Sequence, residues 1–289
     1  MNWLERKELI KSTVVEFGQE RSLMHGAALA YYAMLALVPI LYLTVTFVGK
    51  LVGEAVVIDE IGIMLKENVG LKDPSGILSF LKEADFLNGS TFVETMGVIA
   101  LMFSCTVIFN SLKGSINEFY DIAQAKKKRK NKVIRNLLSR VVSLGFIIGI
   151  TLFFILLYFA EPIFLSLGNK LFEGIELLDL IFLNIVSHVI PIMTNMLIFS
   201  FIFKFLHDGK VAWSAALRGA FLTSVLLYFG QLLIKYYLTH FFFGASGGVA
   251  GAMLIILVWV YYSSQIIFFG AKYIAVYSRM VGQEIQSRN

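Results

Sequence analysis

The stretch LIFLNIVSHVIPIMTNMLIFSFIFKF, residues Leu180–Phe205, decides the fold of this 289-residue chain. It is apolar almost throughout and is longer than the roughly 20 residues that a helix needs to cross a lipid bilayer. It also carries Asn184, His188, Pro191 and Asn195 at helical spacings, so that in a helix these residues share one face. Polar groups inside a bilayer are costly unless they meet one another or line a wet cavity. This face is therefore the first candidate for a functional site.

Composition places the whole chain in the membrane class. Hydrophobic residues make up 57% of the sequence and charged residues 16%, against about 25% charged residues in soluble domains. The mean hydropathy is +0.75. Phenylalanine is abundant, at 26 residues, and proline is scarce, at 4, which favours long helices over a membrane barrel. The one cysteine, Cys105, provides neither a disulfide framework nor a thiolate metal site.

We predict an all-α integral membrane protein with six transmembrane helices and additional interfacial amphipathic helices. A 3+3 inverted arrangement of the spans is an option, because Pro39 and Pro191 lie at similar positions in the first and fourth spans. Residues 1–289 form a single polytopic membrane domain, with an interfacial helix at 1–28, the six-helix bundle at 29–271 and a cytoplasmic tail at 272–289. The expected spans are Leu29–Val52, Thr91–Leu112, Val141–Leu165, Leu180–Phe205, Val211–Ile234 and Val249–Ala271.

Amphipathic segments accompany these spans. In the N-terminal segment, Trp3, Ile10, Val14 and Phe17 share a helical face, which predicts a helix that either lies in the membrane interface or packs on its own domain. Between residues 53 and 90 we expect two short amphipathic helices over the outer mouth, separated at Asp73-Pro74.

The distribution of positive charge predicts the topology. On one side of the six spans lie 19 lysines and arginines, and on the other side 6. Both termini are then cytoplasmic by the positive-inside rule. The densest basic run follows the second span and is expected to set topology and attract anionic lipid headgroups rather than RNA. It consists of Lys126, Lys127, Lys128, Arg129 and Lys130.

A substrate path is the functional interpretation of the polar residues in the spans. The alternative for each is an interhelical hydrogen bond that only holds the bundle together. The candidates in the fourth span are Asn184, Ser187, His188, Pro191, Thr194 and Asn195, and those in the first and last spans are Tyr31, Tyr32, Pro39, Tyr261, Tyr262 and Gln265.

Two stretches carry a resemblance to a known family. ALAYYAMLALVP (Ala28–Pro39) and GGVAGAMLIILVWVYYSSQIIFFGA (Gly247–Ala271) are similar to the first and last spans of the YihY/BrkB family of bacterial inner-membrane proteins. Asn117, Tyr120, Pro191, Trp213 and Gly219-Ala220 fit the same pattern between them. The chain departs from it at Lys272, where the family commonly has an acid, and at His207–Lys210, where it commonly has a proline.

The resemblance implies a compartment, the bacterial inner membrane, more firmly than an activity. The family has been described as a tRNA-processing ribonuclease, formerly ribonuclease BN, as a serum-resistance virulence factor and as an exporter of lipids or small solutes. Metal-dependent cleavage of RNA needs clustered histidines and carboxylates, whereas His25, His188, His207 and His240 are far apart in sequence. We therefore expect no enzyme activity, no cofactor, no metal and no nucleic-acid partner.

The function we expect is transport or flipping of an amphipathic envelope substrate, a lipid or lipid-linked molecule. The alternatives are a small-solute or ion exporter and an envelope scaffold that transports nothing. The expected partners are membrane lipids, a lipid or small-molecule substrate of unknown identity, and a second copy of the chain in a homo-oligomer.

Overall fold

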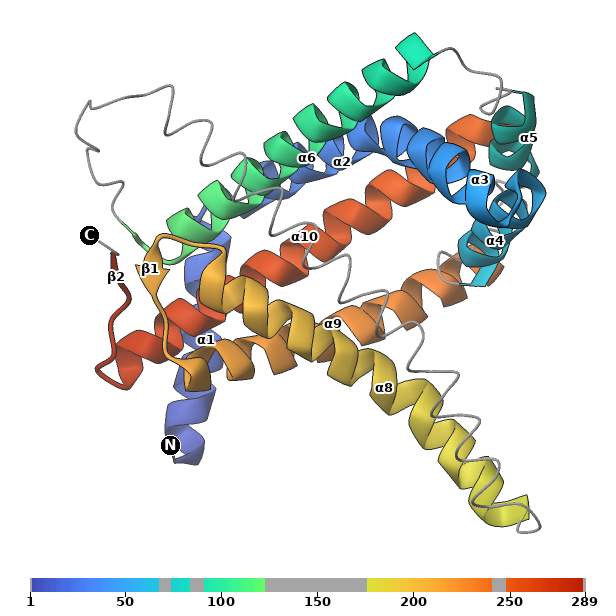
Figure 1. Ribbon diagram of the computed structural model, residues 1–289. Helices are drawn as coiled ribbons and strands as arrows, with labels where there is room; N and C mark the ends of the chain where they lie inside the picture. The colour runs from blue at the N-terminus through green and yellow to red at the C-terminus, as the bar shows by residue number, and fades with distance from the viewer. Residues whose placement is uncertain (1, 68–73, 84–90, 123–175, 241–247, 288–289) are drawn as a thin grey trace, which may run out of the picture. The chain divides into compact units, whose positions relative to one another are not determined.

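The computed structural model describes residues 2–67, 74–83, 91–122, 176–240 and 248–287 and is almost entirely helical there (Figure 1). The helices are α1 (Trp3–Gln19), α2 (Ser22–Leu43), the π-helical turn η1 (Thr44–Val48), α3 (Gly49–Val52), α4 (Glu54–Glu67), α5 (Ser75–Glu83), α6 (Thr91–Phe119), α8 (Glu176–Phe205), α9 (Trp213–His240) and α10 (Gly248–Met280). Two short strands, β1 (Gly209–Lys210) and β2 (Gln286–Ser287), pair antiparallel. The predicted all-α fold class is confirmed.

Five segments of the described chain are long and apolar enough to cross a membrane. They are Ser22–Val52, Thr95–Phe119, His188–Phe205, Trp213–Tyr237 and Met253–Met280, and they correspond to the first, second, fourth, fifth and sixth predicted spans. The third predicted span, Val141–Leu165, lies outside the described residues, as does the basic run at Lys126–Lys130. The chain is a multi-pass membrane protein.

The chain divides into two compact units. The first unit contains Met1–Glu20, Lys113–Tyr228 and Phe268–Asn289, and the second contains Arg21–Leu112 and Phe229–Ile267. Helices α6, α9 and α10 each contribute residues to both units. The single domain over 1–289 and the 3+3 inverted arrangement stay predictions.

The two short amphipathic helices expected before the second span are present as α4 and α5, in the second unit. Their apolar faces form a buried cluster with η1 and α10, made of Val45, Val57, Ile58, Ile77, Leu81 and Ile255. In the same unit α2 and α6 lie side by side (Figure 1), and Gly97 is where the Tyr42 ring approaches α6. Pro39 lies inside α2, and the departure from α-helical hydrogen bonding follows it, at Thr44–Val48.

Helix α1 packs on its own unit, which is one of the two arrangements that the sequence left open; its place in the membrane interface stays a prediction. It packs on the first unit through Leu9, Thr13 and Phe17, the first two of which are buried. Trp3, Ile10 and Val14, which we had grouped with Phe17, are 73%, 58% and 54% exposed. The face that packs is therefore displaced by about one residue position from the predicted face, because Leu9 and Thr13 are neighbours of Phe17 on the helix surface.

Helices α9 and α10 come close together at two glycines of the first unit. A Cβ atom at Gly270 would overlap the Thr223 hydroxyl and lie 3.2 Å from Phe203 Cζ, and one at Gly219 would lie 3.2 Å from the Gly270 carbonyl oxygen. Small residues permit such close helix packing inside a membrane, where no hydrophobic effect drives helices together. This explains why the family pattern contains Gly-Ala pairs at 219 and 270.

We predict that Gly270→Ala lowers the free energy of unfolding by about 1 to 3 kcal/mol, because the added methyl group has no room beside Thr223. Adding Thr223→Ala should restore at least about 0.5 kcal/mol of that loss, since the two positions share one contact. Unfolding of the purified protein in detergent measures both effects. Gly114→Ala in α6 is the control, because a Cβ there meets nothing within 4 Å. Equal effects at Gly270 and Gly114 would contradict the prediction.

Candidate functional site

A buried lysine lies at the centre of the first unit. Lys272 follows the Gly270-Ala271 pair in α10 and is only 1% exposed. Its ammonium nitrogen lies 2.5 Å from Glu20 Oε1, 3.2 Å from Asp121 Oδ2 and 3.6 Å from Glu16 Oε2. It also donates a hydrogen bond of 3.3 Å to the Phe119 carbonyl oxygen. A charge buried in this way is tolerable only when it is paired and hydrogen-bonded, and Lys272 has both kinds of partner.

The carboxylates reach Lys272 because two helices end beside it. Glu20 caps the C-terminus of α1, where its amide donates to the Glu16 carbonyl oxygen. Asp121 follows α6 in the left-handed conformation, with φ of 55°, which aspartate tolerates better than most residues. The amides of Asp121 and Ile122 donate back to the carbonyl oxygens of Glu118 and Asn117, so the turn is held by backbone hydrogen bonds.

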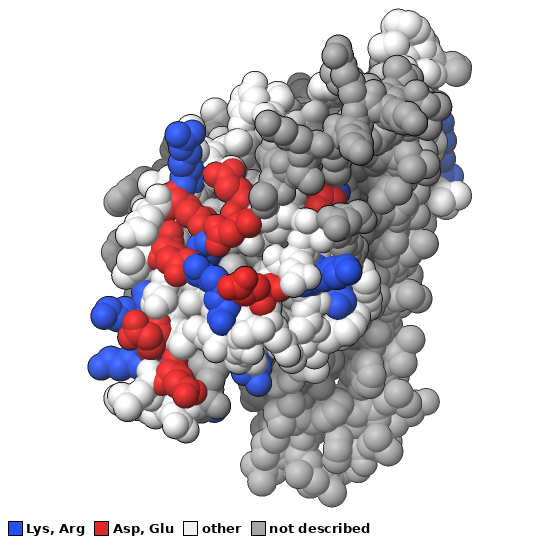
Figure 2. All heavy atoms as spheres, turned by 90° about the vertical axis from the view of Figure 1, so that its left-hand side faces the viewer, with Lys and Arg blue, Asp and Glu red and all other residues white. Residues whose placement is uncertain are grey.

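These charges line a polar cavity of about 550 Å³. Its described lining includes four carboxylates, those of Glu16, Glu20, Asp121 and Glu284, and two cations, Lys272 and Arg279. Arg279 is bonded to Glu16. Figure 2 shows acidic and basic side chains gathered on this side of the first unit. The cavity therefore suits water, protons or small cations better than anions.

Burial raises the pKa of the Glu20 carboxyl above its ordinary value of 4.5. The negative charges of Asp121 and Glu118 raise it further, while the Lys272 ammonium acts in the opposite direction. Desolvation has the largest effect, so Glu20 holds its proton to a higher pH than an exposed glutamate does. Glu20 is thus the member of the cluster best suited to exchange a proton with the cavity.

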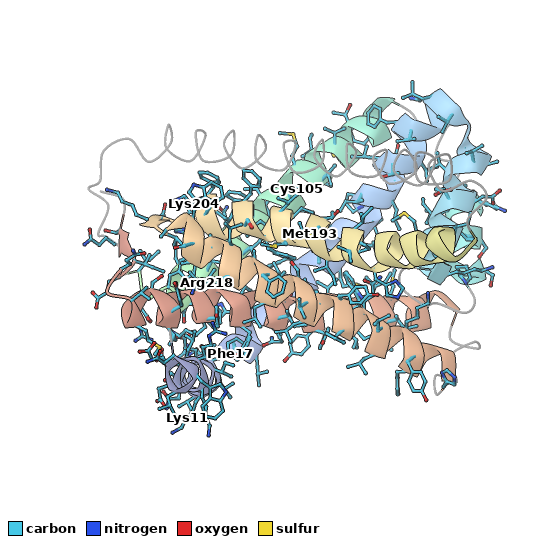
Figure 3. All side chains as sticks on the ribbon, turned by 90° about the horizontal axis from the view of Figure 1, so that it is seen from below. Lys11, Phe17, Cys105, Met193, Lys204 and Arg218 are labelled. Carbon is cyan, nitrogen blue, oxygen red and sulfur yellow. The ribbon has the colours of Figure 1, made fainter. Side chains whose placement is uncertain are left out.

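An aromatic cluster holds the three helices around Lys272 together. The Phe17 ring of α1 stacks on Phe119 at a centroid distance of 5.8 Å and meets Phe269 edge-on at 5.4 Å. Phe119 in turn stacks on Phe268 at 5.1 Å. In Figure 3, Phe17 lies on the side of α1 that faces α10, whereas Lys11 lies on the other side. The position of Glu16 and Glu20 relative to Lys272 therefore depends on the packing of Phe17 against Phe119 and Phe269.

A second polar network links the end of α6 to the turn between α8 and α9. Asn117 donates to Asp208 Oδ2 at 3.0 Å and accepts from the Asp208 amide at 2.9 Å, and Lys113 pairs with Asp208 at 2.9 Å. Tyr120 and His207 both bond the Phe203 carbonyl oxygen. The Gly209 amide donates to His207 Nδ1, so the proton of the neutral ring is on Nε2. The Asn117 and Tyr120 of the family pattern are thus structural anchors of this turn.

The predicted path residues of α8 lie on a continuous helix, as expected. His188 is exposed, with its ring centroid 6.1 Å from that of Tyr228, and Pro191, Thr194 and Asn195 are half-buried. Asn184 and Ser187 belong to α8, but their side chains lie outside the described part of the structure. The role of this stripe in a substrate path stays a prediction.

The other predicted path residues belong to the second unit. Gln265 donates a hydrogen bond of 3.1 Å to the Ser22 carbonyl oxygen, and its amide also lies against Gly26, as does the Tyr261 ring. Tyr262 packs against Gly230 in the same manner. These contacts are of the interhelical kind that we gave as the alternative to a path. Tyr31 is exposed and its ring contacts that of Tyr32, while Pro39 is half-buried.

Sequence reasoning did not identify the Lys272 cluster. It noted Lys272 only as a departure from the family pattern, and it gave no role to Glu16 or Glu20. The available signal was a lysine directly after the last apolar span with no acid within four residues of it in the sequence. Such a lysine must find its counter-charge elsewhere in the fold.

Comparison with known proteins agrees with these structural features. A family model described as "Virulence factor BrkB" matches residues 13–289, nearly the whole chain. This chain belongs to the BrkB family. A UPF0761 membrane protein of Psychromonas ingrahamii is 24% identical to it over 265 residues, which cover 89% of this chain and 82% of that protein. The resemblance to the YihY/BrkB family is therefore confirmed.

A second relative of this BrkB-family chain has a different description. It is the putative ribonuclease-like protein YfkH of Bacillus subtilis, 21% identical over 270 residues, which cover 92% of each chain. No solved structure matches the chain. Within the described residues there is no group of three or more histidines, cysteines, aspartates or glutamates arranged to hold a metal ion.

We predict that Lys272→Met lowers the free energy of unfolding by on the order of 3 kcal/mol, because it leaves the carboxylates of Glu20 and Asp121 without their buried cation. Adding Glu20→Gln should recover part of this loss. Arg279→Gln is the matched control, since Arg279 is 44% exposed and its pair with Glu16 should contribute less than about 1 kcal/mol. Similar losses for the two single variants, measured by denaturant unfolding in detergent, would be incompatible with this account.

We also predict how Glu20 affects stability as pH changes. Because its pKa is higher in the folded protein than in the unfolded chain, Glu20 favours folding most at pH values below 4.5. Its contribution to the free energy of folding falls as the pH rises from the pKa of Glu20 in the unfolded chain to its pKa in the folded protein. The stability of Glu20→Gln relative to the wild type should therefore increase across this window and then become constant. Melting temperatures at a series of pH values measure this difference, and a decrease with rising pH would contradict it.

Proposed function

We propose that this BrkB-family protein is a transporter or flippase of an amphipathic envelope molecule, a lipid or lipid-linked compound. The observation that carries the proposal is the polar cavity around Lys272, located where α6 ends and beside the last turns of α10. Ionisable groups kept at such a cost in a membrane protein commonly mark the path of a substrate or a coupling ion.

Two features favour an amphipathic substrate over a soluble one. Helix α1 exposes Trp3, Ile10 and Val14 beside Lys7 and Lys11, a pattern typical of a helix lying at the level of lipid headgroups. The described spans also expose many large apolar side chains and few polar ones, which does not favour a wide aqueous pore.

In this proposal the α8 stripe provides the part of the path inside the bilayer. Asn184, His188 and Asn195 face the substrate, Pro191 frees the Ser187 carbonyl oxygen for a further partner, and Thr194 lies beside them. The Lys272 cluster forms the end of the path at the predicted cytoplasmic side, where Glu20 exchanges protons. Tyr31, Tyr32, Pro39, Tyr261, Tyr262 and Gln265 stay candidates for the same path.

The proposed location is the bacterial cytoplasmic membrane, with both termini in the cytoplasm. This orientation follows from the distribution of lysine and arginine. We propose no enzyme activity, cofactor or nucleic-acid partner. The proposed partners are membrane lipids and the transported molecule, with a homo-oligomer as the proposed assembly.

We predict that the purified protein in proteoliposomes moves fluorescent phospholipid between leaflets, and that His188→Leu with Asn195→Ala lowers the rate at least about tenfold, equivalent to about 1.4 kcal/mol in the barrier. The reason is that both side chains face the moving headgroup. Reduction of outer-leaflet probe by dithionite measures the rate. Met193→Leu, an exposed apolar residue of the same helix, is the control and should keep the wild-type rate.

Three other outcomes of this experiment would contradict the proposal. An unchanged rate in the His188 and Asn195 variant means that the stripe is structural. Flux of a small solute or ion without lipid movement means that the protein is an exporter of soluble molecules. If neither moves and a stable partner co-purifies, the protein is an envelope scaffold.

A further inference from the structure

The first unit contains a second cavity whose lining has the opposite electrostatic character. It measures about 820 Å³ and lies among α1, α8, α9 and α10. Its described lining contains two arginines, Arg6 and Arg218, and no acid. The remaining lining residues are apolar apart from Tyr273. The cavity around Lys272 has four carboxylates. On charge alone, an anion would therefore bind in the cavity with the two arginines and not in the one around Lys272.

The charged and apolar residues of this cavity lie at different depths along α9. Arg218 is five residues after Trp213, where the candidate span begins, so its long side chain can reach the level expected for lipid headgroups. Leu222 and Leu226 follow on the same helix face, and Leu226 lies about 12 Å further along the axis at about 1.5 Å per residue. A ligand that fits this lining has an anionic end and an apolar tail.

The Arg218 side chain, which would contact the anion, is held in place. The Arg218 guanidinium lies 4.6 Å from the Tyr277 ring centroid, a cation–π contact that orients the side chain. Arg6 belongs to α1. This helix is packed against the rest of the unit at Leu9, which is only 2% exposed. In Figure 3 Arg218 projects from α9 near α10, in the region where the two helices run close together.

The opening of the cavity is on a surface that lipid reaches. Phe221 and Leu217 line the cavity and are 54% and 38% exposed, and both belong to the spanning part of α9. A soluble anion would gain nothing from these apolar walls, whereas an acyl chain buries them. The predicted topology places both arginines on the cytoplasmic side of the membrane.

We propose that this cavity is a binding site for an anionic phospholipid of the cytoplasmic leaflet, with the phosphate between Arg6 and Arg218 and an acyl chain along Phe221, Leu222 and Leu226. Guanidinium groups suit phosphate because they offer a planar set of donors. The site goes beyond the proposed transport function, since binding here does not require that the lipid be moved. Failure of the flux assay would leave it intact.

The test measures lipid binding by the full-length protein with native mass spectrometry. Phosphatidylglycerol and phosphatidylcholine with the same acyl chains are titrated, and phosphatidylglycerol should bind at least about tenfold more tightly. Arg6→Gln and Arg218→Gln should each weaken its binding about fivefold, the effect of one basic residue at an anionic lipid surface. Arg218→Lys keeps the charge but loses the planar set of donors, so its binding should lie between those of the wild type and Arg218→Gln, and it provides the test at this position if Arg218→Gln fails to fold.

Lys7→Gln is the matched control, because Lys7 neighbours Arg6 in sequence but lies over the Trp3 ring, 5.7 Å from its centroid, and does not line the cavity. It should leave phosphatidylglycerol binding unchanged. Equal binding of the two lipids, or equal losses in Lys7→Gln and Arg6→Gln, would overturn the proposal. So would glycerol 3-phosphate competing as well as intact phosphatidylglycerol, because the site would then recognise a soluble anion.

Discussion

The pairing of one buried ammonium group with carboxylates from distant parts of the chain is the constraint on which the first unit depends. Lys272 on α10 meets Glu16 and Glu20 from α1 and Asp121 from the end of α6. The Lys272 ammonium would not be stable alone at its depth, because the desolvation of an unpaired ion costs several kcal/mol. The ends of α1 and α6 must therefore assemble together with this part of α10. The stacked rings of Phe17, Phe119 and Phe268 supply the apolar contact that makes this assembly favourable.

Helix α1 has a different role on each side of the unit. Its C-terminal end provides Glu16 and Glu20 to a cavity with an excess of acid, and its N-terminal end provides Arg6 to a cavity that contains only positive charge. The two cavities thus share one helix but attract ligands of opposite sign. A displacement of α1 would change the linings of both cavities.

The spans were predictable from sequence and the charge cluster was not, for a physical reason. A run of apolar residues such as that before Phe205 must be helical in a bilayer, since no other conformation satisfies its backbone, and hydropathy alone reveals it. The partners of Lys272 lie some 150 to 250 residues away in sequence and are brought to it by tertiary packing. Likewise, the apolar pattern of α1 predicted a helix but not the side that packs. That side includes Leu9 and the polar residue Thr13, which are buried next to Phe17.

The π-helical turn at Thr44–Val48 determines how the helical segment directly after it is oriented in the second unit. A π-helical turn contains one residue more than an α-helical turn. The side chains after it are therefore rotated about the helix axis by about 100° compared with an uninterrupted α-helix. This additional residue determines which way the side chains of α3 face. Because α4 follows α3 directly after Gly53, it also affects the direction of α4. Removing one residue between 44 and 48 would return the winding to regular geometry. Val57 and Ile58 would then turn away from Ile255 of α10, and the apolar cluster would lose its contact with that helix.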